Sequence, residues 1–521
     1  MPTCTINGQK ITVDRGTTVL QAAAEAGFDV PHFCYHPALS IPANCRMCLV
    51  DIERSRKLLP ACYTDVTEGM VVHTENDKVK QARKAVLEFI LVNHPVDCPI
   101  CDQAGECKLQ DYYLAYDAQS SRLRTTKVSK VKVYPLGPEV VYDGERCILC
   151  TRCVRFCDEI TGTGELTVVE RGDRSEIRTF PGHELENDYS MCTVDLCPVG
   201  ALTSRDFRFK CRVWLLTSND SICTGCSRGC SIHLEHHRGE TQRYRPRFNP
   251  EINEYWMCDK GRLSYKELGE DRLGSLLING ATYTWSQGVD RAAELLSERI
   301  GAQGKGSVGV VLSPQASCED LYVGRRFAEE VVGTDRLYIG GKAPGVGDDF
   351  LITPDKNPNR NGLLVMFPRG ARPASFGALI EDMASGRVKT LYMMGSEIPV
   401  EGAERARFLE LVGKLDLFIL QAPRGGGLSE AARVVLPSCT HAEKEGTYIN
   451  VDGVAQTAAR AYAAQGQALP DWQIFMRMAG KLGRPLSFTL FKQLQQAMLE
   501  VMQANTDQPS VESAVGAEAG A

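Results

Sequence analysis

Residues 147–153, Cys-Ile-Leu-Cys-Thr-Arg-Cys, place three thiols in one short loop with the spacing C-x2-C-x2-C. This spacing lets a single loop bind three irons of a cubane [4Fe-4S] cluster, so a fourth thiol must come from elsewhere. Cys157 continues the bacterial ferredoxin run but is followed by aspartate, whereas Cys197 is followed by proline, as the remote ligand usually is. In two-cluster ferredoxins the Cys-Pro cysteine binds the other cluster, and this chain has no second C-x2-C-x2-C. We therefore favour Cys197 as the fourth ligand and treat Cys157 as a neighbour of the cluster.

Three further ligand groups accompany this one. Their spacings are C-x10-C-x2-C-x13-C, H-x3-C-x2-C-x5-C and C-x2-C-x3-C-x27-C. The first suits a [2Fe-2S] cluster, although its first spacer is longer than in plant-type ferredoxins, and the last again fits a cubane. Taken in chain order, the four groups are Cys34, Cys45, Cys48 and Cys62; His94, Cys98, Cys101 and Cys107; Cys147, Cys150, Cys153 and Cys197; and Cys223, Cys226, Cys230 and Cys258. Four metal centres in series predict a path for electrons.

The second group differs from the others because His94 replaces one thiolate. An imidazole removes one negative charge from the centre, and a less negative centre is easier to reduce, so we expect His94 to tune the reduction potential. Zinc is the competing metal, since four thiolates, or three with one histidine, also form structural zinc sites. Disulfides are disfavoured, because disulfide frameworks are typical of small secreted domains and not of a 57.3 kDa chain.

The composition narrows the class of protein. The chain has 521 residues, with 43% hydrophobic and 24% charged residues, which is ordinary for a folded protein. The net charge of -6 argues against nucleic acid as the main partner. The N-terminus lacks the basic and apolar regions of a secretory signal, and no apolar stretch reaches the ~20 residues of a membrane span. Any membrane link is therefore expected to run through a partner.

The N-terminal residues predict a small β-rich module. Residues 3–14 alternate between polar and apolar side chains around Asn7-Gly8, which is a strong hairpin signal. A helix is expected to follow, because Thr18 and Gln21 have the spacing of a capping box and Gly27 supplies the stop.

A second helix is predicted over residues 77–93, just before the proline that follows His94. It should bury one face and deliver His94 to the second ligand group. The predicted buried face is Val79, Ala82, Val86, Phe89 and Ile90.

The pattern of the sequence changes beyond residue 265, where closely spaced cysteines are no longer found. Short apolar strands at residues 307–312 and 390–394 alternate with amphipathic segments such as residues 319–332, which is an α/β pattern. Residues 503–521 are small and polar and are predicted to be a disordered tail.

The ligand groups and their flanking residues resemble the large iron–sulfur subunit of respiratory complex I, the G-subunit family of bacterial NADH-quinone oxidoreductases. The resemblance covers about residues 1–265 and is carried by residues 34–62, His94–Cys107, Arg146-Cys-Ile-Leu-Cys-Thr-Arg-Cys153 and Asp195-Leu-Cys-Pro-Val-Gly-Ala-Leu-Thr203. It implies one [2Fe-2S] and two [4Fe-4S] clusters in the first three groups. The fourth group matches an extra [4Fe-4S] cluster, off the main path, that some bacterial members retain.

The same resemblance implies partners and a location. Electrons would pass from an NADH/FMN-binding subunit towards a quinone-side ferredoxin-type subunit, and the complex as a whole would translocate protons. The chain would carry electrons without binding NADH and without a catalytic acid, base or nucleophile. It would lie peripherally on the cytoplasmic face of the inner membrane, with contact to the membrane only through partners.

The C-terminal half resembles a molybdopterin oxidoreductase domain, through Cys258-Asp-Lys-Gly-Arg262 and residues 435–450. Two features depart from that family: the domain looks internally shortened, and no convincing Cys or Ser ligand for molybdenum is found. Cys318 falls where a helix should begin, which is a poor position for a ligand, and Lys260 matches the lysine that links cluster and pterin. We therefore expect a scaffold without molybdopterin.

The expected fold is an α+β N-terminal part, with a ferredoxin-like β-grasp domain and iron–sulfur domains, followed by a shortened α/β molybdopterin-oxidoreductase-like domain. The predicted boundaries are 1–76 for the [2Fe-2S] domain, 77–135 for the His/Cys domain, 136–214 for the ferredoxin-like [4Fe-4S] domain, 215–270 for the fourth-cluster domain, 271–500 for the degenerate domain and 501–521 for the tail.

Three other classes of protein remain as alternatives. An NAD-linked molybdenum formate dehydrogenase α-subunit shares the N-terminal iron–sulfur ligand groups but needs a molybdenum ligand and a complete pterin domain. An iron-only hydrogenase needs downstream cysteine motifs that are missing here. A zinc-stabilised scaffold would contain zinc and no iron. The glycine run at residues 424–427 is predicted to be a plain loop, because the strand–helix context of a dinucleotide site is not recognised around it.

Overall fold

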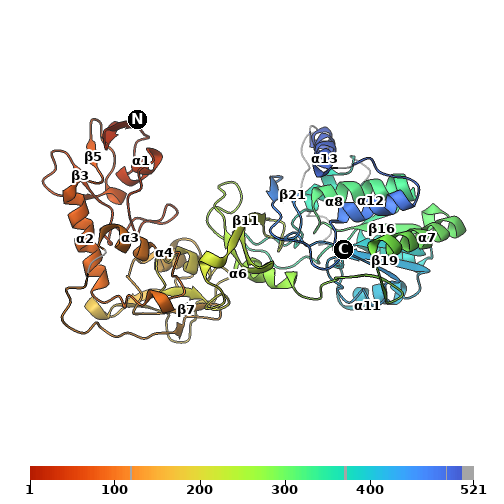
Figure 1. The fold of residues 1–521 in the computed structure, drawn as a ribbon, viewed down its shortest axis with the longest axis horizontal. Coiled ribbons are helices and arrows are strands. Elements are labelled where there is room, and N and C mark those ends of the chain that lie inside the picture. Colours follow the sequence, from red (N-terminus) through yellow and green to blue (C-terminus); the bar gives the residue numbers. More distant parts are fainter. Residues whose placement is uncertain (118–119, 369–371, 489, 507–521) are drawn as a thin grey trace. The chain divides into compact units, whose positions relative to one another are not determined.

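The computed structural model describes residues 1–117, 120–368, 372–488 and 490–506. It divides into two compact units, Met1–Leu216 (unit 1) and Thr217–Ala521 (unit 2), which are described separately (Figure 1). The division falls next to the boundary predicted between residues 214 and 215.

Unit 1 begins with the predicted hairpin and helix. The hairpin turns at Asn7 and Gly8, whose φ angles of 47° and 88° suit a type I′ turn. Thr18 and Gln21 form the capping box, which confirms that prediction. The sheet order is β2-β1-β5-β3-β4, with β1 and β5 parallel. The elements are β1 Thr3–Ile6, β2 Gln9–Thr12, α1 Val19–Glu25, β3 Leu49–Ile52, β4 Leu59–Pro60, a 3-10 turn Ala61–Tyr63 and β5 Val71–His73.

The next helix, α2 (Asp77–Leu91), ends before His94 as expected but buries a different face. Its buried residues are Val79, Arg83 and Leu87, spaced by four, whereas Phe89 is 80% exposed. The prediction was therefore right for Val79 and wrong for the rest of the face, because Ala82, Val86 and Ile90 are only partly buried. The guanidinium of Arg83 lies 5.3 Å from the Tyr116 ring centroid and donates to the Tyr116 hydroxyl at 3.2 Å. A pattern of apolar residues cannot predict a buried face that contains an arginine.

The rest of unit 1 is built from short elements joined by loops. The longest regular element between residues 136 and 216 is α4, with eight residues. The elements are α3 Lys108–Tyr116, β6 Tyr134–Pro135, β7 Val140–Tyr142, α4 Arg152–Glu159, β8 Thr167–Val169, β9 Glu176–Arg178, α5 Cys192–Leu196 and β10 Leu202–Ser204, with 3-10 turns at Cys98–Ile100, Gly172–Arg174 and Val213–Leu215.

Unit 2 starts with a three-stranded antiparallel sheet, β11 (Thr217–Ile222), β12 (Ser231–His237) and β13 (Glu240–Pro246). A seven-stranded sheet follows with the order β15-β14-β20-β19-β18-β16-β17. The strands from β20 to β17 in this order are all parallel. The strands are β14 Leu276–Ile278, β15 Ala281–Tyr283, β16 Val308–Leu312, β17 Leu337–Ile339, β18 Thr390–Met394, β19 Leu417–Ala422 and β20 Val434–Pro437, with a separate pair β21 Gly446–Ile449 and β22 Ala455–Ala458.

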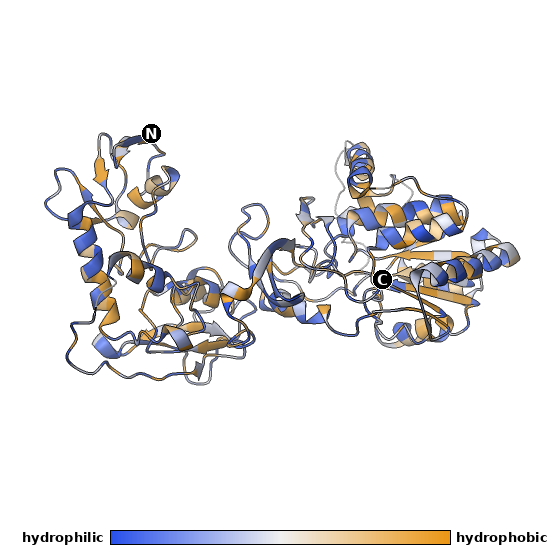
Figure 2. Ribbon diagram, in the orientation of Figure 1, coloured by the Kyte–Doolittle hydropathy of each residue, from blue (hydrophilic) through white to orange (hydrophobic). Residues whose placement is uncertain are grey.

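Helices cover both faces of this sheet, which confirms the α/β prediction. Alternate residues of β19 belong to different apolar clusters: Leu417 and Ile419 pack on one side, and Phe418 and Leu420 on the other. Figure 1 shows α8 and α12 on one side and α11 on the other, and the strands between them are hydrophobic in Figure 2. The helices are α6 Asp259–Leu263, α7 Trp285–Gln303, α8 Cys318–Arg326, α9 Arg360–Val365, α10 Phe376–Ala384, α11 Gly402–Val412, α12 Asp471–Lys481 and α13 Phe491–Thr506.

Two outcomes concern the C-terminus and the membrane. Helix α13 extends to Thr506, so the predicted disordered tail was wrong over residues 501–506, and residues 507–521 lie outside the described residues. Within the described ranges, every helix is too short or too polar to cross a membrane.

Candidate metal centres

The first ligand group brings its four thiols together in unit 1. Hydrogen bonds from Cys45 and Cys62 lower the pKa of the Cys34 thiol, which favours its thiolate form. The same contacts raise the pKa of Cys45 and Cys62, and Cys62 also bonds Cys48. Such a set of mutually bonded thiols can bind a cationic iron centre, because metal binding releases the remaining protons.

The ligand loops adopt unusual backbone conformations. Arg46, between two ligands, has φ 57°, and Leu149 and Thr151, on either side of Cys150, have φ 53° and 59°. Residues other than glycine rarely adopt this left-handed region, and such outliers concentrate at functional sites. The Leu149 amide donates to Cys147 Sγ at 3.4 Å. Amide bonds to sulfur of this kind help to set the potential of an iron–sulfur centre.

In the second group, His94 has the protonation state and the unpaired nitrogen that a metal ligand requires. Cys98 starts a 3-10 turn and Cys107 caps α3. Burial raises the pKa of Cys107 to about 11 and lowers that of His94 to about 4, so the imidazole is neutral. Its Nδ1 atom is buried without a hydrogen-bond partner. A neutral ring with a free nitrogen is the form in which histidine binds metal.

The surroundings of the second group are tightly packed and charge-balanced. A Cβ atom on Gly200 would lie 2.3 Å from Cys101 Sγ, so only glycine fits there. Arg146 is buried and donates to both carboxylate oxygens of Asp97, at 3.0 and 2.7 Å. Its Nη1 also lies 3.5 Å from the carboxylate of Asp143. This positive charge is therefore neutralised beside the ligand loop.

The third group lines one small cavity with all four predicted ligands, Cys147, Cys150, Cys153 and Cys197. Cys157 is buried but does not line the cavity. Burial raises the pKa of Cys150 to about 11 and that of Cys197 to about 12. Thiols held in this way ionise only when a cation compensates the charge, which is what iron supplies. The arrangement favours Cys197 over Cys157 as the fourth ligand.

The fourth group lies in unit 2, where its four cysteines line a cavity of about 660 Å³. The amides of Gly225 and Gly261 donate to Cys223 Sγ at 3.4 Å and to Cys258 Sγ at 3.3 Å. A Cβ atom on Gly261 would lie 3.0 Å from Cys223 Sγ, so the backbone approaches the ligands closely here.

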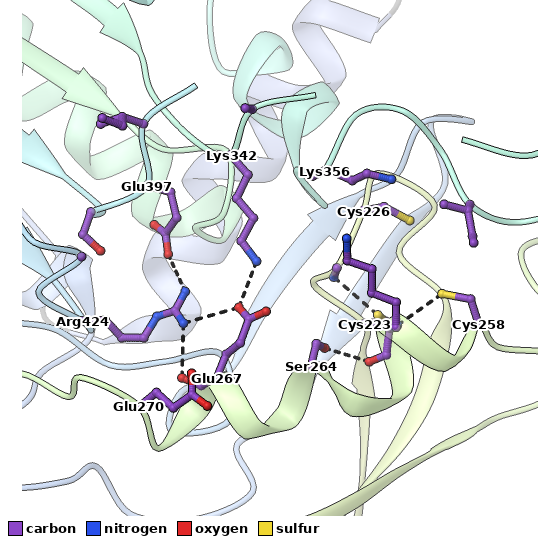
Figure 3. Close-up of a pocket in the computed structure, with 18 of the residues that line it drawn as sticks. Cys223, Cys226, Cys258, Ser264, Glu267, Glu270, Lys342, Lys356, Glu397 and Arg424 are labelled. Carbon is purple, nitrogen blue, oxygen red and sulfur yellow. Dashed lines mark hydrogen bonds and ion pairs between the residues drawn. The ribbon is translucent and has the colours of Figure 1, made fainter. Parts of the chain in front are cut away.

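The other part of this cavity contains ion pairs that we did not predict from the sequence (Figure 3). Lys342 bonds Glu267 at 3.1 Å, and Arg424 bonds Glu397 at 2.9 Å and Glu267 at 3.4 Å. Lys342, Glu397 and Arg424 follow β17, β18 and β19, so they lie at the carboxyl ends of parallel strands, where such sheets bind ligands. Knowing the strands would have been enough to locate this edge.

The glycine run at residues 424–427 is more than a plain loop. It follows β19 directly, whereas a turn and not a helix comes after it. Arg424 and Gly426 line the cavity, and the Gly426 amide donates to the carboxylate of Asp271 at 2.7 Å. The prediction therefore missed the preceding strand, although the missing helix was anticipated.

The cavity does not offer a suitable charge for a phosphate-bearing pterin. Five basic side chains line it, Lys260, Lys342, Lys356, Arg405 and Arg424, together with five acidic ones, Glu267, Glu270, Asp271, Glu397 and Glu401. The balance leaves no net positive charge for phosphates, and two of the cations are already paired. Cys318 is the first residue of α8, donates to Asn359 Oδ1 at 3.5 Å and is not among the lining residues.

A buried ion pair lies beside a second cavity in unit 2. Lys444 Nζ bonds Asp320 at 2.7 Å and Asp471 at 2.6 Å, and all three side chains are at most 6% exposed. Burial alone would lower the pKa of Lys444, but the two carboxylates raise it well above its usual value. Unlike a ligand thiol, this charge is compensated by the chain itself.

Comparisons with known families assign separate matches to the ligand groups and to the C-terminal sheet. Residues 1–77 match a 2Fe-2S iron-sulfur cluster binding domain, and residues 83–122 match the NADH-ubiquinone oxidoreductase-G iron-sulfur binding region. Residues 137–203 match the ferredoxin-like domain of NADH-quinone oxidoreductase subunit 3. Residues 216–269 match the molybdopterin oxidoreductase Fe4S4 domain, and residues 367–481 match the molybdopterin oxidoreductase family. The fold and the ligand groups thus define an iron–sulfur protein with a molybdopterin-oxidoreductase-type C-terminal half.

Curated relatives narrow this class to one family. The G subunit of NADH-quinone oxidoreductase from Rickettsia typhi is 41% identical over 92% of this chain and 86% of its own length. The corresponding G subunits of Streptomyces coelicolor and Rickettsia bellii are 32% and 40% identical over 92% and 63% of this chain. The chain belongs to the G-subunit family of NADH-quinone oxidoreductases. It spans about half the length of the last two relatives, 58% and 48%.

Proposed function

We propose that this chain is the iron–sulfur electron-transfer subunit in the peripheral arm of an NADH:quinone oxidoreductase. It would relay electrons from the NADH/FMN-binding subunit towards the quinone-side ferredoxin-type subunit, with proton translocation coupled by the whole complex. The observation that carries the proposal is the presence of four separate groups of buried or partly buried thiols, one of which includes a histidine, with three groups in unit 1 and one in unit 2. The subunit would reach the cytoplasmic face of the membrane through its partners.

The four groups are proposed to hold one [2Fe-2S] and three [4Fe-4S] clusters, which supply one-electron redox chemistry when bound. The role of the chain is to bind and insulate them. Buried loops exclude water, amides directed at sulfur tune the potentials, and His94 makes the second centre less negative. No acid, base or nucleophile is needed for this chemistry.

The C-terminal sheet is proposed to be a scaffold without molybdopterin. Support comes from the paired charges of the cavity and from the position of Cys318, which leaves no thiol among the described lining residues beyond the fourth ligand group. The NAD-linked formate dehydrogenase alternative predicts molybdenum at about one atom per chain.

The test is metal analysis combined with low-temperature EPR during a redox titration of the intact protein. One [2Fe-2S] and three [4Fe-4S] signals, with about fourteen irons in total and no molybdenum, would support the proposal. Zinc without iron, or stoichiometric molybdenum, would overturn it.

Single substitutions assign the ligands. Cys34→Ser, Cys98→Ser, Cys147→Ser and Cys223→Ser should each remove one different signal. Cys197→Ala should remove the third signal and Cys157→Ala should keep it. Cys4→Ala is the matched control, because Cys4 is a buried cysteine of the apolar core outside the four groups.

A further inference from the structure

Two arginines of α4, Arg152 and Arg155, connect the first and third ligand groups. Arg155 is buried, and Arg152 is partly buried with its Nε atom enclosed and without a partner. Both belong to the segment that follows Cys150, yet both reach the loop that carries Cys34. Neither residue was assigned a role from the sequence.

Their hydrogen bonds join the two groups directly. Arg155 Nη2 donates to the carbonyl of Cys34 at 2.6 Å and to that of Cys150 at 3.4 Å. Arg152 donates to the carbonyl of Tyr35, next to Cys34, and to that of Leu196, next to Cys197, the latter at 3.2 Å. One pair of guanidinium groups thus contacts ligand residues, or their neighbours, in both groups.

Neither guanidinium is paired with a carboxylate anywhere in the described ranges. Apart from the hydroxyl of Thr151, all their acceptors are backbone carbonyls, which carry no charge. Burial lowers the pKa of Arg152, and the thiols of Cys150, Cys197 and Cys34 act in the opposite direction. Cations enclosed without a counter-charge are costly, so the compensating negative charge must come from the ligand groups themselves.

We propose that Arg152 and Arg155 are a shared positive counter-charge for the first and third iron–sulfur centres, which sets the reduction equilibria of both together. A centre becomes more negative when it accepts an electron, so a nearby fixed cation favours the reduced form. Both arginines are positioning residues that act on the centres through space and through the ligand loops. The inference rests on the function proposed above.

The test is the same EPR-monitored redox titration, applied to the holoprotein with Arg152→Gln or Arg155→Gln. Each substitution should make both centres harder to reduce, by about tenfold in the equilibrium constant, which is about 59 mV for one electron. Arg155→Lys keeps the charge, so both centres should keep potentials close to those of the unmodified protein. Arg171→Gln, at an exposed arginine of the same unit, should change neither centre.

A shift in only one centre, no shift with both centres present, or an equal shift in Arg155→Lys would overturn the inference. A wild-type protein without iron would instead overturn the proposed function, so the two failures are distinguishable. If the glutamine variants lose a centre, Thr151→Asp and Thr151→Asn replace them, because Thr151 Oγ1 lies 3.4 Å from Arg155 Nε. Asp and Asn both tolerate the φ of 59° found there.

The aspartate would pair with Arg155 and neutralise it while leaving both arginines in place. Relative to Thr151→Asn, it should make the first and third centres harder to reduce. A change confined to the third centre, whose ligand Cys150 precedes Thr151, would show only the direct effect of the new charge and would overturn the shared role.

Discussion

The ligand loops of unit 1 and the α/β sheet of unit 2 are stabilised by different means. The sheet buries apolar residues on both faces, and the buried Lys444 beside it has two carboxylate partners within the chain. The loops around the third ligand group consist of short elements, left-handed residues and buried thiols whose pKa is raised. The cations of α4, Arg152 and Arg155, are bonded to backbone carbonyls and to one hydroxyl, without a carboxylate. The stability of the sheet therefore comes from contacts within the chain, whereas we expect the stability of the loops to depend on bound metal.

The largest effect should follow removal of iron by a chelator under reducing conditions. The loops of the first three ligand groups should lose amide protection, because the ligands that tie them together are released. The seven-stranded sheet should keep its protection, since its core contains no ligand. Hydrogen exchange read by mass spectrometry measures both in one sample. Equal loss of protection in the sheet and in the loops would remove the distinction between the two regions.

Lys444→Met tests whether the buried ion pair stabilises unit 2 without any contribution from metal. Removing one partner of a buried ion pair leaves charges uncompensated, so the unfolding free energy of unit 2 should fall by about 3–5 kcal/mol. Lys414→Met is the matched control, because Lys414 forms an exposed pair with Glu410 and should cost less than about 1 kcal/mol. Thermal or denaturant unfolding measures both variants. Similar losses of stability in the two variants would contradict the stabilising role of the buried ion pair. Loss of the first three EPR signals in Lys444→Met would show that the centres of unit 1 depend on unit 2, which would also contradict the distinction between the two regions.

The parts of the fold that could be predicted from the sequence are those governed by local rules. The hairpin at Asn7-Gly8 and the helix capped by Thr18 follow from turn and capping chemistry, and strands β16 and β18 follow from runs of apolar residues. The groups of ligands were found because metal binding requires cysteines at short, fixed spacings.

The features that were missed depend on contacts between distant segments. The buried face of α2 runs through Arg83, whose burial depends on Tyr116 in α3, so periodicity alone misplaced it. The ion pair of Arg424 with Glu397 exists only because β18 and β19 are neighbours in the sheet. Arg152 and Arg155 lie within the predicted ligand loop, yet their role becomes visible only when the carbonyls of Cys34 and Tyr35 are brought to them.

Gly200→Ala and Gly301→Ala compare close packing around a ligand with open space on a helix. A Cβ atom at residue 200 would overlap Cys101 Sγ, so we expect a loss of about 1–3 kcal/mol, together with lower occupancy of the second centre. At residue 301, in α7, nothing lies within 4 Å, so alanine should stabilise the helix by up to about 1 kcal/mol. Unfolding curves and the amplitude of the second EPR signal measure the pair. A neutral Gly200→Ala would contradict the close approach.

The smallest expected effect is a change of potential without a change of fold. His94→Cys replaces a neutral ligand with a negative one, so the second centre should become harder to reduce, by about tenfold or 59 mV for one electron. Arg146 does not compensate the added negative charge, because its own positive charge is already neutralised by Asp97 and Asp143. The first and third centres should keep their potentials, since this substitution leaves Arg152 and Arg155 in place. An EPR titration with iron analysis checks that the centre is retained. An unchanged or higher potential would mean that the charge of this ligand is compensated by its surroundings, and the contrast between the neutralised second group and the uncompensated cations beside the other two would then be lost.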